Sequence, residues 1–231
     1  MPRRRYDQAC SVATALDRVG ERWSMLIVRE LLLGPLRFSE LARTVGGAPT
    51  DVLTRRLRDL EEDGVVRRRE LEAPASGTVY ELTDVGYELE GTVLDLGRWG
   101  LHFYRLEDLP GLVTTSLANP LRVILEPPEG AETIVLQLHS EGHSTWLRIG
   151  GGESSAGRGE TEAALVLSGT APDVIGAIVL GGEAEERVEI EGDRGLLPRL
   201  RSWVVLPDRL RAEVEAAGPG AVDRVGLPPA A

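Results

Sequence analysis

Residues 48–64 combine an apolar helix face with a set of polar side chains that can bind bases and phosphates. The apolar residues recur at helical spacing, at Val52, Leu53, Leu57 and Leu60. The polar positions off that face are Thr50, Asp51, Thr54, Arg55 and Arg58, with Arg56 beside them. Arg55 and Arg56 are the strongest candidates, because a guanidinium can fork onto a guanine or clamp a phosphate. The alternative is a solvated helix face neutralised by Glu61 and Glu62.

Cys10 is the only cysteine of the chain, which excludes an intrachain disulfide and a cysteine-caged zinc ion. It precedes a predicted helix and follows Arg3, Arg4 and Arg5, and both the helix dipole and these charges would favour its thiolate. A redox role would then require an intersubunit disulfide or a mixed disulfide with a small thiol. The alternative is a small buried apolar side chain.

The remaining candidates for chemistry are weak. His139, Glu141 and His143 lie in LHSEGHSTW, where Glu-Gly predicts a hairpin turn between two strands, so we expect no metal site. The glycines of IGGGESSAGRG follow a strand without opening a helix, which favours a flexible loop over a phosphate-binding loop. No nucleophile–base pair and no metal-ligand spacing is found. We therefore expect neither an enzyme nor a cofactor.

Three shorter helices are predicted ahead of residues 48–64. They span residues 11–20, 21–35 and 37–47, with Ser11 as the first cap and glycines at the ends. The order of short helix, Gly46-Gly47 turn and longer helix with a polar start is typical of a helix-turn-helix.

A hairpin is predicted next, because VVRRREL and TVYEL have strand composition and flank the turn-prone EAPASG. Its arginines Arg67, Arg68 and Arg69 must alternate between the two faces of a strand, so at most some of them can face one DNA backbone. From Thr83, a long helix is expected to run to about Tyr104. Its apolar stripe is coiled-coil-like, at Val85, Leu89, Val93, Leu96, Gly100 and Phe103. Gly91, Gly97 and Gly100 indicate the close approach of a neighbouring helix, such as one from a second subunit.

From Cys10 to about Trp99 the sequence resembles the HxlR family of bacterial winged helix-turn-helix transcription regulators. The resemblance rests on GERW, LLLGPLRFSEL, VLTRRLRDLEEDGVV and YELTDVG. It implies a homodimer, paired through the first and last helices of this domain, that binds a pseudo-palindromic operator in double-stranded promoter DNA. It also implies a regulatory cysteine where Cys10 stands.

The strand and helix signals of the second half predict elements in the order β-β-β-α-β-α, with an antiparallel sheet. The phrases TAPDVIGAIVLGG and RVEIEGDRGLLPRL resemble the sterol carrier protein type 2-like fold over residues 115–207. This resemblance implies a cavity for an apolar small-molecule effector, although a closed core is equally consistent with the pattern. The candidate lining residues are Ile134, Leu136, Leu147, Leu165, Ile175, Ile178, Leu197 and Trp203.

The charge is distributed unevenly along the chain. The net charge is −11, yet residues 1–105 carry 16 arginines against 17 acidic residues, and residues 106–231 carry 10 against 20. We therefore expect only the first half to contact DNA. The N-terminus lacks a secretory apolar core and no apolar run is long enough to span a membrane, which predicts a cytoplasmic protein without a membrane partner.

The expected fold class is α+β. An N-terminal winged helix-turn-helix domain, mainly α with a β-hairpin wing, would span residues 1–105. A C-terminal α+β domain with an antiparallel sheet and helices would span residues 112–210, and a tail residues 211–231. The main functional hypothesis is a homodimeric repressor modulated by the effector, and the alternative is an apolar-ligand carrier that uses its winged-helix half for dimerisation or protein interaction. The predicted DNA-binding residues are Ser39, Thr50, Asp51, Thr54, Arg55, Arg56, Arg58, Arg68, Ser76 and Thr78.

Overall fold

The computed structural model describes residues 5–72, 75–107 and 116–217 of the chain. The chain divides into two compact units, Met1–Val93 and Leu94–Ala231, so the division falls inside a helix rather than near residue 105. The predicted domain start at residue 112 and the end of the predicted tail, residues 218–231, lie outside the described residues. None of the described helices is long and apolar enough to cross a membrane.

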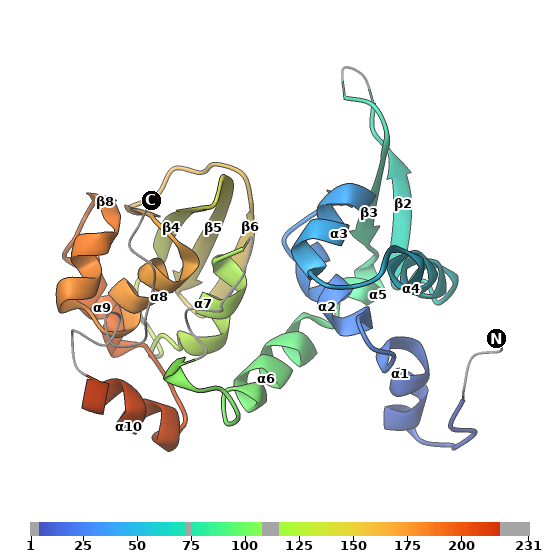
Figure 1. Cartoon of the computed structure of the whole chain (residues 1–231), viewed down its shortest axis with the longest axis horizontal. Helices are drawn as coiled ribbons and strands as arrows, with labels where there is room; N and C mark the ends of the chain where they lie inside the picture. The colour runs from blue at the N-terminus through green and yellow to red at the C-terminus, as the bar shows by residue number, and fades with distance from the viewer. Residues whose placement is uncertain (1–4, 73–74, 108–115, 218–231) are drawn as a thin grey trace. The chain divides into compact units, whose positions relative to one another are not determined.

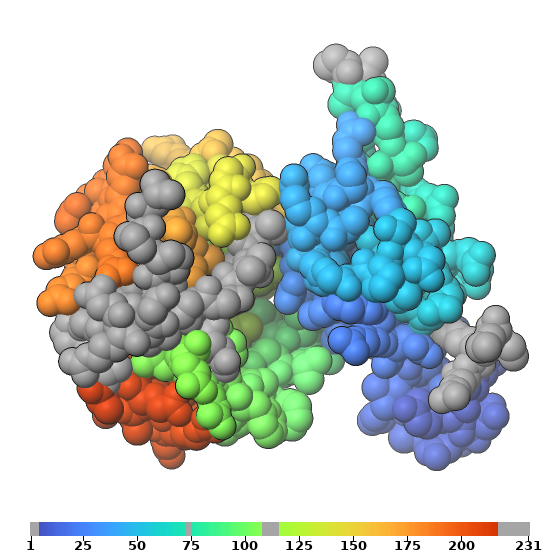
Figure 2. All heavy atoms as spheres, in the orientation of Figure 1, coloured from blue at the N-terminus to red at the C-terminus, as the bar shows by residue number. Residues whose placement is uncertain are grey.

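The first unit contains the expected helix-turn-helix and wing (Figure 1). Its helices are α1 (Ser11–Val19), α2 (Ser24–Leu31), α3 (Phe38–Val45), α4 (Thr50–Glu62), α5 (Asp84–Tyr87) and the first part of α6 (Glu90–Gly100). Its strands are β1 (Leu36–Arg37), β2 (Val66–Glu70) and β3 (Thr78–Leu82), in the antiparallel order β1-β3-β2. The hairpin of β2 and β3 extends away from the rest of the unit in both views (Figures 1 and 2).

A single apolar core holds this unit together. It is formed by side chains from α2, α3, α4 and the wing sheet, including Ile27, Leu31, Leu41, Leu53, Leu57, Leu60 and Leu82. These are the positions that helical and strand periodicity predicts, and each is at most 2% exposed. Burying leucines at this depth contributes about 1.5–3 kcal/mol per side chain.

The long helix expected from Thr83 to Tyr104 is interrupted. The Thr83 hydroxyl caps α5 by accepting a hydrogen bond from the Gly86 amide, as predicted, but α5 ends at Tyr87 and α6 begins at Glu90. Leu89 and Val93 pack against the core of the first unit. Gly97 does accommodate a close neighbour, yet that neighbour is Val123 of the same chain, because a Cβ on Gly97 would lie 2.8 Å from a Val123 methyl group.

The second unit is an α+β structure built on a five-stranded sheet. Its strands are β4 (Ile134–Ser140), β5 (His143–Gly150), β6 (Glu153–Arg158), β7 (Leu165–Ser168) and β8 (Glu189–Gly192), in the order β6-β5-β4-β7-β8. Its helices are α7 (Ala118–Ile124), α8 (Ala171–Val179), the 3-10 helix η2 (Gly182–Arg187), α9 (Leu196–Ser202) and α10 (Asp208–Ala217).

Two features of this sheet differ from the expectation. The pairing of β4 with β7 is parallel, so the sheet is mixed rather than fully antiparallel. Residues 153–158, expected in a flexible loop, form the edge strand β6, whose six residues all pair with β5. The segment is rich in serine and glycine, so its strand conformation comes from this pairing and not from local propensity.

Alternate residues of β4, β5 and β7 form the apolar interior of the second unit together with α8 and α9. All eight predicted cavity residues lie in this interior, and Ile175, at 8%, is the most exposed of them. Burial to this depth is expected of a closed hydrophobic core and of the lining of an enclosed cavity alike.

Candidate nucleic-acid interface

The turn between α3 and α4 presents the start of α4 to the surface. Gly46 and Gly47 have positive φ angles of 62° and 72°, a conformation that suits glycine, and Pro49 precedes the first turn of α4. Burial of Leu53, Leu57 and Leu60 then fixes which side of α4 faces outward. The polar start of α4 is held rigidly as a consequence.

Five of the predicted contact residues on α4 are exposed, namely Thr50, Asp51, Thr54, Arg55 and Arg58. The Thr54 hydroxyl donates to the Thr50 carbonyl at 2.7 Å, which partly satisfies it within the helix. Arg58 lies 3.8 Å from the Glu62 carboxylate. Arg55 makes no hydrogen bond or ion pair with any described residue. Arg55 is therefore the α4 cation most available to an external anion or base.

Arg56 differs from the expectation, because the structure does not bring it to the exposed surface. It is 7% exposed, and its guanidinium lies 3.1 Å from Asp59 and 3.5 Å from Glu21. A buried guanidinium is stable only when carboxylates neutralise it, and these two do so from α4 itself and from the turn before α2. Arg56 therefore holds α4 to the body of the unit. A second ion pair, Arg18 with Asp63, joins α1 to the end of α4.

Of the predicted wing residues, two are already bonded to other side chains of the wing and α4. Ser76 is exposed, but the Thr78 hydroxyl donates to the Glu70 carboxylate at 2.7 Å. The Arg68 guanidinium lies 3.1 Å from Glu61 and stacks 5.4 Å above the Tyr80 ring. Arg68 is thus already engaged on the face of the sheet that bears the core.

Arg67 and Arg69 lie on the opposite face and share one carboxylate. Each donates its Nε–H to a different oxygen of Glu81, both at 2.8 Å. Burial alone would raise the pKa of Glu81, but the hydrogen bonds and charges of Arg69 and Arg67 outweigh it and lower the pKa below its ordinary value.

Three further polar residues border this region. Ser39 is exposed at the start of α3, as predicted, and Arg43 is exposed near its end. Arg37 lies against the turn of the wing, because a Cβ on Gly77 would lie 2.5 Å from its Nη1 atom. Sequence reasoning missed Arg37 and Arg43, since neither falls on the helix that the motif singles out.

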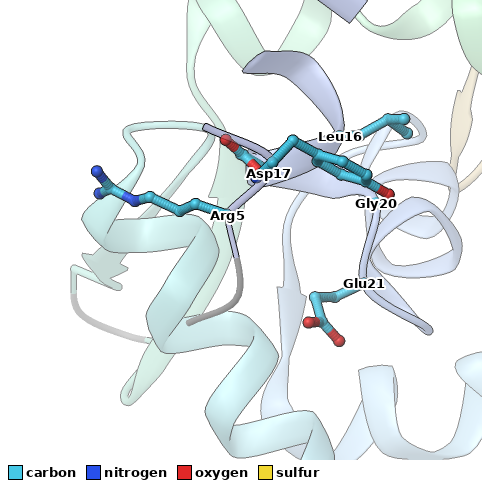
Figure 3. Close-up of a pocket in the computed structure, with 6 residues that line it drawn as sticks. Arg5, Leu16, Asp17, Gly20 and Glu21 are labelled. Atoms are coloured by element: carbon cyan, nitrogen blue, oxygen red, sulfur yellow. The ribbon is translucent and has the colours of Figure 1, made fainter. Parts of the chain in front are cut away.

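Cys10 is exposed at the N-cap position of α1, where its thiol makes no cap hydrogen bond. Arg5 is described, whereas Arg3 and Arg4 lie outside the described residues. A pocket of about 340 Å³ opens beside α1 (Figure 3), lined by Arg5, Tyr6, Leu16, Asp17, Gly20 and Glu21. Glu21 is the residue that pairs with Arg56. The redox role of Cys10 stays a prediction.

The histidine candidates lie where the sequence places them, beside the Glu141-Gly142 turn that joins β4 and β5. A ring nitrogen of His139, Nδ1, is 2.9 Å from the Ser144 hydroxyl. Within residues 5–72, 75–107 and 116–217, no group of three His, Cys, Asp or Glu side chains is arranged to hold a metal ion.

Apolar side chains are exposed on the two helices that the family resemblance assigns to dimerisation. Val12 and Leu16 of α1 are 64% and 42% exposed. In and after α6, Leu96, Trp99 and Phe103 are 50%, 61% and 66% exposed, and the rings of Trp99 and Phe103 pack edge to face at 4.9 Å. Large apolar side chains at such exposure, in either unit, are ones that a further chain can cover.

The family described as HxlR-like helix-turn-helix matches residues 18–108 of this chain. Among curated relatives, an uncharacterised HTH-type transcriptional regulator of Mycobacterium tuberculosis is 41% identical over 90 residues, which are 39% of this chain and 56% of the relative. The chain therefore spans little more than half the length of that relative. The uncharacterised HTH-type transcriptional regulator YdeP of Bacillus subtilis is 33% identical over 93 residues, or 40% of this chain and 73% of the relative.

Solved structures resemble the same part of the chain. The reduced form of the transcriptional regulator YodB from B. subtilis is 32% identical, with a TM-score of 0.37, and the match covers 42% of this chain and 95% of that one.

Arg56→Ala should lower the free energy of unfolding by about 1–3 kcal/mol, because it leaves the Asp59 and Glu21 carboxylates without their shared cation. Arg55→Ala removes the same side chain from an exposed position and should change stability by less than about 0.5 kcal/mol. Urea denaturation of the two variants measures the difference. Equal stability of both would contradict the structural role of Arg56.

Glu81 should contribute stability at neutral pH that disappears in acid. Its pKa is lowered in the folded chain, so the contribution is present above the ordinary value of 4.5 and is lost as the pH falls through the folded pKa. Glu81→Gln should therefore cost about 0.5–1 kcal/mol at pH 7 and less at pH 3. Thermal melts across this range, with Glu72→Gln as an exposed control, test the claim. A deficit that does not shrink in acid would refute it.

Proposed function

Because the chain belongs to the HxlR-like helix-turn-helix family, we propose that it is a transcription regulator that binds duplex DNA through α4 and the wing. The observation that carries the proposal is Arg55, an exposed guanidinium on the outer side of α4 without a partner among the described residues. A recognition helix inserts its N-terminal residues into the major groove, where a guanidinium can fork onto a guanine. Thr50, Asp51, Thr54 and Arg58 accompany it there, while Arg56 acts through the fold.

The regulator is proposed to act as a homodimer. The exposed apolar residues of α1 and α6 support this, because a second copy would remove Val12, Leu16, Leu96, Trp99 and Phe103 from water. Two-fold symmetry then predicts a pseudo-palindromic operator with half-sites about one DNA turn apart. A dimer that covers such a site within a promoter would exclude RNA polymerase, which is why we assign repression.

The second unit is proposed to sense an apolar small molecule. Its interior between the sheet and α8 and α9 is lined by aliphatic side chains, among them Leu136, Leu165 and Ile178. Because these residues are buried, a ligand would have to open this interior on entry. The free-energy difference between the closed and the opened interior would then couple ligand binding to DNA affinity.

Arg55→Ala should weaken binding to the duplex immediately upstream of the protein's own gene by about 1–3 kcal/mol, because it removes one forked base contact. Fluorescence anisotropy with random DNA as competitor measures the affinity. Arg148→Ala, which removes an exposed arginine of β5, is the matched control and should leave affinity unchanged. Equal affinities of the two variants would refute the assignment of α4 as the recognition helix.

Trp99→Ser should shift the protein from dimer to monomer, because it removes the largest exposed apolar side chain of α6. Sedimentation velocity at micromolar concentration measures the change. The control is Val205→Ser, which alters an apolar side chain that is 43% exposed at a site remote in sequence from both α1 and α6. A wild-type protein that sediments as a monomer would refute the dimer itself.

A fluorescent long-chain fatty acid should bind the protein, raise its melting temperature and reduce operator affinity about 5- to 150-fold, a coupling of about 1–3 kcal/mol. Fluorescence titration and anisotropy report the two events separately. Ligand binding without any salt-sensitive DNA affinity in the apo protein would favour the carrier hypothesis. Absence of ligand binding would refute the sensing role and leave the DNA-binding role intact.

A further inference from the structure

The outer face of the wing sheet carries three arginines. Strand alternation turns Val66 into the core, where it is 1% exposed, and turns Arg67 and Arg69 to the other side. Arg69 and Arg37 are both paired with Val79 of the central strand, one from each flanking strand. The three guanidinium groups therefore share the sheet face opposite the core.

Glu81 organises two of these arginines into a pair. Because the Arg67 and Arg69 Nε atoms each bind one Glu81 oxygen at 2.8 Å, a single carboxylate holds both guanidinium groups. Their terminal nitrogens make no hydrogen bond with a described residue. The side chains stay 65% and 47% exposed, whereas Glu81 is 9% exposed. The group has one net positive charge and presents the forked ends of two guanidinium groups.

We propose that Arg67 and Arg69, held by Glu81, form a phosphate-binding pair on the outer face of the wing, and that this pair supplies the wing's contact with the DNA backbone. The inference rests on the proposed function and names residues that the sequence prediction did not select. The terminal nitrogens of a guanidinium match two oxygens of a phosphodiester, and contacts of this type position a protein without specifying sequence.

Arg68 is excluded from the pair by its own contacts. Its Nε lies 3.1 Å from the Glu61 carboxylate and its guanidinium covers the Tyr80 ring, both on the core side of the sheet. Arg68 carries the same charge as Arg67 and Arg69 and lies between them on the same strand. Arg68→Ala is therefore a matched control for Arg67→Ala and Arg69→Ala.

The test is the salt dependence of DNA binding by the full-length chain. Fluorescence anisotropy is measured in a sodium chloride series, with the duplex upstream of the gene and with a random duplex of equal length. Each phosphate contact contributes about 0.9 to the slope of log affinity against log salt. Arg67→Ala and Arg69→Ala should each lower the slope by about 0.9 on both duplexes, and Arg68→Ala should leave it unchanged.

Glu81→Gln tests the carboxylate separately. It retains both arginines and raises the net charge of the group from one to two, so affinity for the random duplex should rise several-fold. A fall in affinity, measured at a temperature at which both proteins are fully folded, would overturn the role of Glu81 as the group that limits this charge.

The outcomes separate this inference from the proposed function. If the wild-type protein binds DNA and the slopes of Arg67→Ala and Arg69→Ala match the wild type, only the phosphate pair is refuted. The pair is also refuted if Arg68→Ala lowers the slope as much as they do. If the wild-type protein binds neither duplex at any salt concentration, the proposed function and the pair fail together.

Discussion

Burial of one side of α4 is the constraint on which the rest of the first unit depends. Leu53, Leu57 and Leu60 are fully enclosed by α2, α3 and the wing sheet, so α4 cannot rotate without exposing them. The Arg56 guanidinium adds a second restraint, because it joins α4 to Glu21 in the turn before α2. The apolar contacts set the outward face of α4, and the ion pair ties the helix to the turn between α1 and α2.

Internal carboxylates decide which arginines remain available in this nearly neutral half of the chain. Arg56 and Arg68 each contact acidic side chains, whereas Arg67 and Arg69 share a single carboxylate and keep one net positive charge between them. Arg55 contacts no acidic side chain, and so its charge is uncompensated within the described structure. A binding surface with few free cations gains less from non-specific attraction, and base contacts then supply a larger share of its affinity.

Periodicity predicted the elements of the first unit well because their buried faces follow local spacing. Leu41 and Val45 in α3 and Leu53, Leu57 and Leu60 in α4 lie where a period of 3.6 places them. The burial of Arg56 was not predicted, because its partner Glu21 is distant in sequence. No local pattern indicates a guanidinium that a tertiary contact neutralises. Strand β6 was missed for a related reason, since its pairing with β5 overrides a composition typical of loops. Strand alternation predicts that Arg67 and Arg69 share one face, and the burial of Val66 shows that this is the face opposite the core.

The helix α6 gives the proposed effector unit a covalent connection to the DNA-binding unit. Leu89, just before α6, and Val93, within it, pack into the core of the first unit. The later α6 residue Arg98 lies 3.3 Å from Glu126, just after α7, and Gly97 faces Val123. Leu96 and Trp99, on the same helix, belong to the exposed apolar set assigned to the dimer. A change that moves α7 in the second unit would therefore act on the helix that bears part of this exposed apolar set.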